Sequence, residues 1–316
     1  MIPRELLRSP TDAGPLHDGD GALVSSDGRL YPIVGGVPVL IDNDLSVFSV
    51  EEVVGGQFVE ASQSLRRAFV RKLIPSRSLS FGTAQRYASF ARQIQETTEH
   101  GRVLVIGGGK LGSNMSPLFE SGLEIIESDV YLSPRVDVVC DGHNLPFVDE
   151  AFDGIVMQAV LEHVLDPVRV VSEAHRVLKP AGLIYAESPF LQGVHEGAFD
   201  FTRWTELGHR RLFRMFKELD RGVVAGPGTA LLWSIRYFAR ALPRRRGKLP
   251  LILDKLATAG FFWVTVFDLI LIKHPGATDG ASGTYFVGQK SSDAVDDDVL
   301  LASYAGSVGR PFRRGA

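Results

Sequence analysis

The sequence predicts an α/β fold built on a doubly wound, mostly parallel sheet. The run Val103–Ile106 is apolar and strand-like, and it ends in the glycine turn 107–112, which a helix can follow. A second strand-like run, Leu123–Asp129, ends in acidic residues about 20 positions after the glycines. Further apolar runs at 136–141 and 151–157 continue the series. Strands that alternate with helix-length segments are typical of βαβ units.

The glycine turn predicts a nucleotide-binding corner. Gly107, Gly109 and Gly112 follow the G-x-G-x-x-G spacing. A side chain at Gly107 or Gly109 would keep a ligand away from the backbone, and the following helix offers free N–H groups. The spacing alone fits sites for NAD, FAD and S-adenosylmethionine (SAM), and it also fits a plain loop. Asp129 is placed to accept the two hydroxyl hydrogens of a ribose, so the sequence predicts a nucleoside cofactor.

The downstream motifs distinguish these cofactors. They are Asp141, Asn144–Phe147, Phe152–Asp153, Leu161–Val164 and Arg176–Ile184. This order, over about residues 100–190, resembles the class I SAM-dependent methyltransferases of the branch with the series "D…LPF…FD…LEHV…RVLKPGG". The resemblance implies a Rossmann-like, seven-stranded sheet with SAM as the cofactor.

The resemblance also implies which residues hold the cofactor. These are Gly107, Gly109, Gly112, Asp129, Asp141 and His143. The first two glycines would pass under the methionine part of SAM, and Asp141 with the region of His143 would border the adenine. Val105 stands where the family usually has an acid, and Gly112 lies further along than the usual third glycine. The geometry of the methionine pocket is therefore expected to differ from the family's.

Composition bounds the class and the compartment. The chain has 316 residues, of which 45% are hydrophobic and 22% charged, as in an ordinary soluble protein. A formal charge of −3 without a long lysine-rich arm disfavours a nucleic-acid substrate. The single cysteine, Cys140, allows no intramolecular disulfide, and its apolar surroundings predict a buried thiol. The N-terminus lacks the apolar core of a secretory signal, so we expect a cytoplasmic protein.

Four segments are predicted along the chain. They are a small module at 1–45, a helical linker or lid at 46–100, the methyltransferase domain at 101–290 with a helical insertion at about 225–280, and a flexible tail at 291–316. The pattern "LR-x-P…GPL…L…YPI-x-G-x-P-x-L" in the first module resembles zinc-ribbon-like domains that accompany many methyltransferases. Ser9, Asp12, Ser25 and Ser26 occupy the neighbourhoods where zinc-binding cysteines would be expected, so no metal ligand is predicted.

The segment 189–205 is the best candidate for the acceptor side of the active site. It follows a strand at the carboxyl edge of the sheet, where ligands meet open α/β sheets. His195 is the predicted general base, and Asp200 or Arg203 would orient it or the substrate. The segment resembles the "H…DF-x-R-x-T" stretch of some uncharacterised bacterial methyltransferases that are often associated with glycan or surface-polymer pathways. In the competing interpretation, Asp200 and Arg203 pair along one turn and only brace the loop.

The rest of the C-terminal half yields structural expectations. His163 is expected to support the cofactor pocket, and His209 to lie on the surface of an amphipathic helix over Leu207–Leu219. A sixth strand is expected to begin near Val223, and the last strand to cover Thr284–Gly288.

The helical insertion has two interpretations. Its apolar run Gly260–Ile272 is judged too short, and too interrupted by Asp268, to span a bilayer. With the basic cluster 244–248, the stretch 228–273 could instead lie on an anionic membrane or hold a lipid-linked substrate. Alternatively, these helices only cap the core.

Together these observations predict a SAM-dependent methyltransferase that acts on a small-molecule, glycan or lipid-linked acceptor. An oxygen nucleophile would displace the sulfonium in line. The expected location is the cytoplasm, with peripheral contact at the inner membrane face; the oligomeric state is not predicted. Two alternatives are an inactive methyltransferase-like scaffold and an NAD-dependent oxidoreductase.

Overall fold

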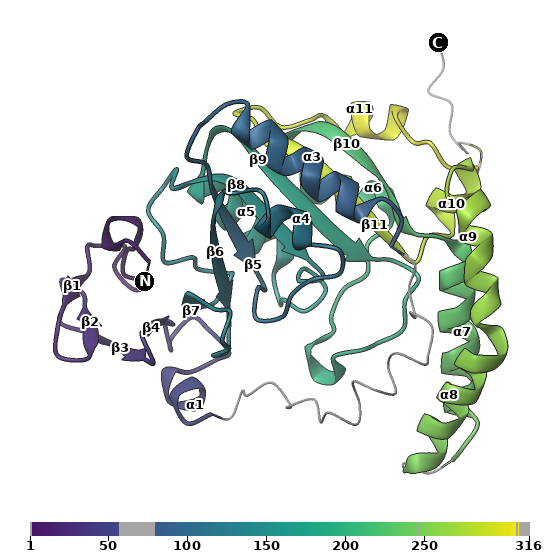
Figure 1. The fold of residues 1–316 in the computed structure, drawn as a ribbon, viewed down its shortest axis with the longest axis horizontal. Coiled ribbons are helices and arrows are strands. Elements are labelled where there is room, and N and C mark those ends of the chain that lie inside the picture. Colours follow the sequence, from purple (N-terminus) through teal and green to yellow (C-terminus); the bar gives the residue numbers. More distant parts are fainter. Residues whose placement is uncertain (1, 57–79, 245–246, 308, 310–316) are drawn as a thin grey trace.

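A single mixed sheet organises the computed structural model, which describes residues 2–56, 80–244, 247–307 and 309. The described strands form an eleven-stranded sheet in the order β1-β2-β3-β4-β7-β6-β5-β8-β9-β11-β10 (Figure 1). Strands β7, β6, β5, β8 and β9 are parallel to one another, whereas β11 runs antiparallel to both β9 and β10. The predicted fold class is confirmed. The sheet has eleven strands rather than seven because four N-terminal strands extend its edge.

The strand bounds are β1 His17–Asp18, β2 Ala22–Val24, β3 Leu30–Val34, β4 Val37–Leu40, β5 Arg102–Ile106, β6 Glu124–Asp129, β7 Val138–Cys140, β8 Phe152–Gln158, β9 Leu178–Pro189, β10 Phe216–Ala225 and β11 Gly283–Lys290. The α-helices are α1 Val50–Val54, α3 Thr83–Gln95, α4 Ser116–Phe119, α5 Pro167–Val177, α6 Glu206–Leu212, α7 Pro227–Ala241, α8 Lys248–Phe261, α9 Asp268–Leu271, α10 Pro275–Asp279 and α11 Asp297–Ala302. Three short 3₁₀ helices are η1 Arg4–Leu6, η2 Gly197–Phe199 and η3 Phe262–Phe267.

Both faces of the parallel strands are buried, which explains their continuous apolar runs. On β5, Val103 and Val105 pack with α3 and α4 on one face. Leu104 and Ile106 belong to the core on the other face, where α5 packs. Helices therefore cover the sheet on both sides, as the term doubly wound implies.

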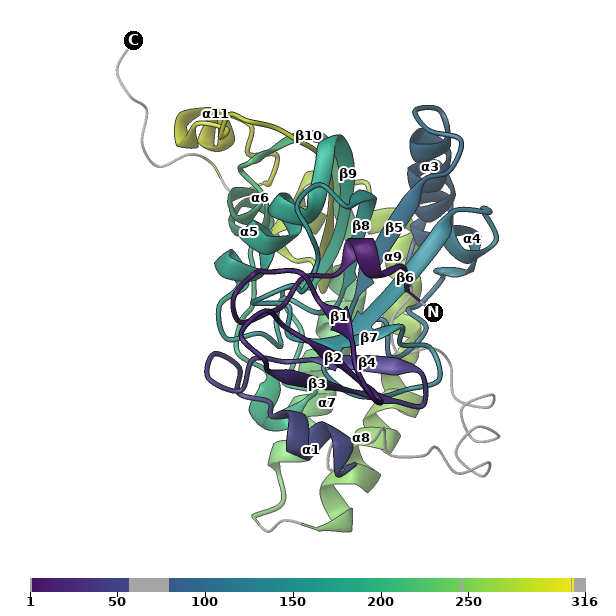
Figure 2. The same ribbon diagram turned by 90° about the vertical axis from the view of Figure 1, so that its left-hand side faces the viewer.

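The N-terminal strands are continuous with this sheet. β4 pairs in parallel with β7, with Val39 opposite Val139. Leu23 and Tyr31 belong to the same hydrophobic core as the residues under α5. Figure 2 shows β1–β4 laid against the β7 edge. The N-terminal segment thus shares its core with the rest of the chain, while its boundary at residue 45 remains a prediction.

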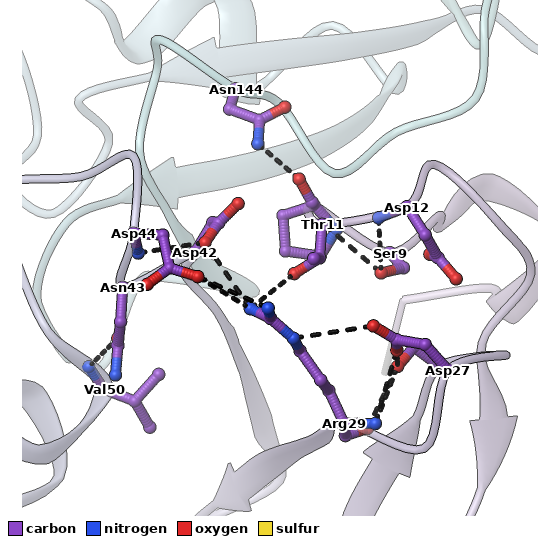
Figure 3. A network of polar contacts seen from close by, with 12 residues as sticks. Ser9, Thr11, Asp12, Asp27, Arg29, Asp42, Asn43, Asp44, Val50 and Asn144 are labelled. Atoms are coloured by element: carbon purple, nitrogen blue, oxygen red, sulfur yellow. Dashed lines mark hydrogen bonds and ion pairs between the residues drawn. The ribbon is translucent and has the colours of Figure 1, made fainter.

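Local hydrogen bonds hold the loops where the zinc-ribbon resemblance would place cysteines, and Figure 3 shows those at Ser9 and Asp12. The Ser9 hydroxyl accepts the Thr11 backbone N–H at 3.3 Å, and the Ser25 hydroxyl accepts the Arg29 N–H at 3.0 Å. The Arg29 guanidinium lies 3.3 Å from Asp44, 3.5 Å from Asp27 and 3.8 Å from Asp42. In this structure, an arginine and its carboxylates connect the loops of the module.

The predicted helical character of 46–100 is seen in α1 and α3. Helix α1 begins with a capping box between Ser49 and Glu52, and α3 buries Tyr87 and Phe90 against the sheet. Residues 57–79 of this predicted helical linker lie outside the described residues.

Two C-terminal expectations are corrected. The helix expected over Leu207–Leu219 ends at Leu212, and β10 already begins at Phe216 because this stretch pairs with β11. Pairing with a neighbouring strand overrides the helical pattern of the sequence. The expected flexible tail contains α11, whose Leu300 is buried and whose Asp297 accepts a hydrogen bond from Arg211 at 2.9 Å.

His209 is not a surface residue. It lies on the inward face of α6 with 1% of its surface exposed, and its Nδ1 is 3.1 Å from the Thr284 hydroxyl on β11. Burial lowers the pKa of His209 to about 3. The expectation failed because its neighbours Gly208 and Arg210 suggested a solvated face, whereas α6 packs that face against β11.

Acid should therefore destabilise the fold through His209. Unfolded chains bind a proton at histidine below the ordinary pKa of 6.5, while the folded chain does not until about 3. Stability falls as the pH drops through this window, by about 1.4 kcal/mol per pH unit. Between pH 6.5 and pH 5, wild type should lose about 2 kcal/mol more than His209→Gln in urea unfolding. Equal losses in the two proteins would contradict the assignment.

The insertion before β11 is a helical hairpin that projects beyond the sheet in both views (Figures 1 and 2). Asp268 caps the start of α7 by accepting the N–H groups of Gly228 at 2.7 Å and Thr229 at 2.9 Å. The stretch Lys248–Leu271 is 24 residues long with a mean hydropathy of 1.4 over its most apolar window, enough to cross a membrane by length and composition. The helical stretch thus begins at Lys248 rather than Gly260, and it is divided into α8, η3 and α9. The expectation that the run Gly260–Ile272 does not span a bilayer stays a prediction.

Candidate active site

One large cavity lies at the carboxyl ends of the parallel strands. Its volume is about 690 Å³, and its lining includes Gly107 after β5, Asp129 at the end of β6, Asp141 after β7 and Gln158 at the end of β8. This is the edge where ligands bind in open α/β sheets. Five of the six predicted cofactor residues line the cavity, and Gly109 does not.

The glycine turn leaves no room for side chains. Gly107 has φ +76°, and a Cβ there would lie 2.5 Å from a methyl of Val160. A Cβ at Gly112 would lie 1.9 Å from the side-chain oxygen of Gln158. Glycine is therefore required at Gly107, where φ is positive. At Gly112 a side chain would force the end of Gln158 to move.

Asp129 connects the turn to the second strand. Its Oδ2 accepts the Gly109 N–H at 2.8 Å, and its Oδ1 accepts the Val130 N–H at 2.7 Å. Burial raises the pKa of Asp129. Each oxygen keeps a second lone pair for a ribose hydroxyl. The bare backbone cradle and the two-acceptor carboxylate fit a nucleoside cofactor such as SAM.

Asp141 and His143 form a fixed rim beside this end of the cavity. Asp141 Oδ1 accepts the N–H of His143 at 2.9 Å and lies 2.6 Å from its Nδ1, and the Ser46 hydroxyl donates to Asp141 Oδ2. His143 Nε2 accepts the Asp166 N–H at the start of α5 at 3.0 Å. Burial alone would raise the pKa of Asp141, but the hydrogen bonds from His143 and Ser46 outweigh it and lower the pKa. Both ring nitrogens of His143 are thus engaged.

The acceptor segment brings its three predicted catalytic residues together. Asp200 accepts the His195 backbone N–H at 2.8 Å and lies 3.3 Å from His195 Nδ1. Arg203 donates hydrogen bonds to both carboxylate oxygens of Asp200, one of them at 2.8 Å, and to the Gln192 carbonyl at 3.0 Å. Burial opposes ionisation of Asp200, but the contacts with Arg203 and His195 prevail and lower its pKa to about 2. Of the three, only His195 lines the cavity; Asp200 and Arg203 lie behind it.

Glu162 is a functional candidate that the sequence analysis missed. Its carboxylate lies 3.7 Å from His163 Nε2 and 3.8 Å from His195 Nε2. Glu162 is fully buried, and burial raises its pKa to about 8. The available signal was an acid directly after the apolar pair Val160–Leu161. His163, expected to support the cofactor pocket, faces His195 with ring centroids 4.8 Å apart.

A second buried acid, Glu187 on β9, was also missed. It accepts hydrogen bonds from Gln158 at 2.8 Å and Thr83 at 3.3 Å. Burial raises its pKa. Glu187 therefore ties α3 to the sheet at the cavity wall, which gives the segment before β5 a contact with the site.

Comparisons with known proteins agree with this geometry. Residues 106–186 match the sequence profile of the methyltransferase domain family. A demethylmenaquinone methyltransferase of Paenarthrobacter aurescens is 28% identical over 120 residues, which cover 34% of this chain and 47% of the relative. An uncharacterized methyltransferase of Mycobacterium sp. (strain KMS) is 30% identical over 116 residues, 34% of this chain and 46% of the relative. The chain thus spans about half the length of the curated relatives it matches.

Among solved structures, a 1,6-didemethyltoxoflavin-N1-methyltransferase of Burkholderia thailandensis matches 88% of this chain and 99% of its own, with 16% identity and a TM-score of 0.42. A phosphoethanolamine N-methyltransferase of Haemonchus contortus matches 72% of this chain and 57% of its own, with 16% identity and a TM-score of 0.44.

The strand order, the glycine cradle and the matched domain define a class I SAM-dependent methyltransferase domain. SAM is its cofactor. The resemblance in the sequence is therefore confirmed for the class and for the cofactor. The individual site residues remain predictions.

Asp129→Ala should weaken SAM binding tenfold or more, about 1.5 kcal/mol, because the charged acceptor for the ribose hydroxyls is lost. Isothermal titration calorimetry with SAM measures the effect. Glu124→Gln is the control, since it removes a carboxylate from the start of the same strand, where Glu124 pairs with Arg102 at 2.8 Å. Unchanged affinity in Asp129→Ala, or an equal loss in the control, would refute the ribose role.

Proposed function

We propose that this protein transfers the methyl group of SAM to a hydroxyl oxygen of a small, lipid-linked acceptor. One observation carries the proposal: a single cavity joins the cofactor end at Gly107 and Asp129 to a cluster of Glu162, His163 and His195. That arrangement lets a nucleophile meet the methyl donor in a shared space. The relatives named demethylmenaquinone methyltransferases support a small-molecule acceptor.

The chemistry needs alignment and the loss of one proton. SAM supplies a sulfonium methyl, which the acceptor oxygen takes while the carbon–sulfur bond breaks and leaves its electron pair on sulfur. The acceptor hydroxyl must give up its proton, and an imidazole is suited to help at neutral pH. Asp200 and the Gly193 carbonyl lie beside His195 Nδ1, each at 3.3 Å, which favours the proton on Nδ1. The lone pair of Nε2 then lies on the Glu162 side of the ring.

Several features support catalysis over the scaffold alternative. An inactive scaffold needs neither the glycine cradle nor the fixed ribose carboxylate Asp129. It also has no need for an arginine-clamped Asp200 behind His195, a group that lines the cavity. All of these are assembled at one edge of the sheet, so the proposal assigns them to turnover.

The helical hairpin supports a lipid-linked acceptor and a membrane surface as its source. Leu249, Ile252 and Leu256 are spaced three and four apart on α8, and each is more than half exposed. The opposite face of α8 carries Asp254 and Thr258, both buried. The apolar stripe thus faces outward and the polar residues face inward, the reverse of a helix in water.

Charges favour contact in the plane of the membrane. Arg236 on α7 pairs with Asp254 at 2.9 Å inside the hairpin, and Asp268 caps α7. The basic residues Arg244 and Lys248 flank the tip and suit an anionic surface. We therefore propose peripheral contact of a cytoplasmic protein with the inner membrane face through residues 228–273.

His195→Ala should lower methyl transfer by about a hundredfold while SAM affinity and thermal stability stay within error. The assay incubates the protein with methyl-labelled SAM and lipid extracts, and follows the label into lipid by mass spectrometry. Asp200→Asn should lower turnover less, since it removes the charge behind His195 but keeps the side chain's size. The control is His175→Gln, whose histidine contacts the Ser291 carbonyl at 2.9 Å and does not line the cavity. Normal turnover in His195→Ala would contradict the proposed role.

The double variant Ile252→Glu with Leu256→Glu should bind anionic vesicles at least tenfold more weakly than wild type, because it places charge on the proposed contact face. Sedimentation with vesicles of phosphatidylglycerol and phosphatidylcholine measures the partition. Val168→Glu on α5 is the matched control, because Val168 is 65% exposed but lies outside the hairpin. Equal vesicle binding by wild type and the double variant would remove the hairpin from the proposal.

A further inference from the structure

Three ligand-type side chains converge at the acceptor end of the cavity. Glu162, His163 and His195 each offer one oxygen or nitrogen atom, and these atoms lie within 4.8 Å of one another. The two imidazole nitrogens nearest the carboxylate are 3.7 Å and 3.8 Å from Glu162 Oε1. Metal bonds of about 2.1 Å in a tetrahedron hold the donor atoms about 3.4 Å apart. The two distances from Glu162 to the imidazole nitrogens are therefore longer than this spacing by only about a few tenths of an ångström.

Glu162 has no partner that explains its burial. Both carboxylate oxygens are buried without a hydrogen-bond partner among the residues that the structure describes. Neither histidine nitrogen is near enough to Glu162 for a hydrogen bond. A buried carboxylate without a partner loses its hydration and gains nothing in return. A cation between the carboxylate and the two imidazoles would resolve this.

The outer nitrogens of both imidazoles are already oriented. His163 Nδ1 donates to the Phe199 carbonyl at 2.6 Å, and His195 Nδ1 lies 3.3 Å from Asp200. With the protons on Nδ1, both Nε2 atoms carry lone pairs on the side of Glu162. A carbonyl or carboxylate behind each histidine is the usual support of a metal-bound imidazole. Arg203 extends this support because it fixes Asp200 from behind.

We propose that Glu162, His163 and His195 are the protein ligands of a divalent transition-metal ion at the acceptor end of the cavity. Two imidazoles and one carboxylate suit Zn²⁺, Fe²⁺ or Co²⁺, whereas Mg²⁺ prefers a shell of oxygen atoms. Three protein ligands leave coordination positions open for a further oxygen ligand. The expectation that the chain has no metal ligand is revised for this cluster.

The role of the ion rests on the proposed function, although its binding does not. A hydroxyl oxygen bound to the ion would release its proton to water more easily, and the resulting alkoxide or phenolate is the better nucleophile. His195 then acts as a ligand, not as the group that takes the proton. The two roles of His195 exclude each other, since both use the Nε2 lone pair.

Metal binding can be measured without an acceptor. Tag-free full-length protein, stripped with a chelator, is titrated with Zn²⁺ by calorimetry and with Co²⁺ by its visible absorption. We expect one ion per chain, Co²⁺ bands of a four- or five-coordinate site, and no comparable heat with Mg²⁺. Glu162→Gln and His195→Ala should each weaken Zn²⁺ binding by about a hundredfold, and Asp200→Asn by about tenfold because it disturbs only the support of His195.

Two histidine controls keep the test specific. His175→Gln and His17→Ala should bind Zn²⁺ like wild type, because neither residue belongs to the cluster. Absence of stoichiometric binding, or equal binding in wild type, Glu162→Gln and His195→Ala, overturns the metal site. If methyl transfer still depends on His195 in that case, the proposed function stands with His195 as a direct base. If the ion binds as expected but no hydroxyl accepts label from SAM, the proposed function fails and the site remains.

Discussion

Burial of the parallel strands on both faces is the constraint on which the rest of the structure depends. Val103 and Val105 face one layer of helices, while Leu104 and Ile106 face the other, so β5 has no solvated side. Polar loops can therefore lie only at the ends of the strands. The carboxyl ends of β5, β6, β7, β8 and β9 consequently deliver their loops to one edge. Polar groups excluded from both faces collect there, and the cavity is the space between those loops.

At the acceptor end of the cavity, two nearby carboxylates have pKa values shifted in opposite directions. Asp200 meets a bidentate arginine, so its pKa falls to about 2 despite its burial. Glu162 meets only ring nitrogens at more than hydrogen-bond distance, so burial prevails and its pKa rises to about 8. Two differences separate the groups: Asp200 has a charged partner, and Glu162 is more deeply buried. Asp200 stays charged and can orient the ligand His195. Glu162 has no hydrogen-bond partner among the described residues and can bind a cation.

The sequence predicted the fold, and five of the six residues it assigned to the cofactor line the cavity, because both depend on local patterns. Val103–Ile106 followed by glycines, and an acid at Asp129 after the next strand, are signals within single βαβ units. The missed features depend on contacts between distant segments. Glu162 and His195 lie 33 positions apart in the sequence, and only the return of the chain after β9 brings them together. His209 and the early start of β10 were missed for the same reason, since their environment is set by β11, more than 60 positions further along the chain.

The sequence of the helical hairpin also leaves its environment open. Its sequence is apolar enough for a membrane, yet whether an apolar helix lies inside a core or on a surface depends on which face its neighbours cover. Here α7 covers the face of α8 that carries Asp254, because Arg236 needs that carboxylate as a partner once both are buried. The ion pair therefore sets the rotation of α8 and turns Leu249, Ile252 and Leu256 outward. An outward apolar surface of this kind is stable in contact with lipid. Tyr237 on α7 also contacts the Val194 carbonyl beside His195. The hairpin that would meet the membrane therefore touches the acceptor segment.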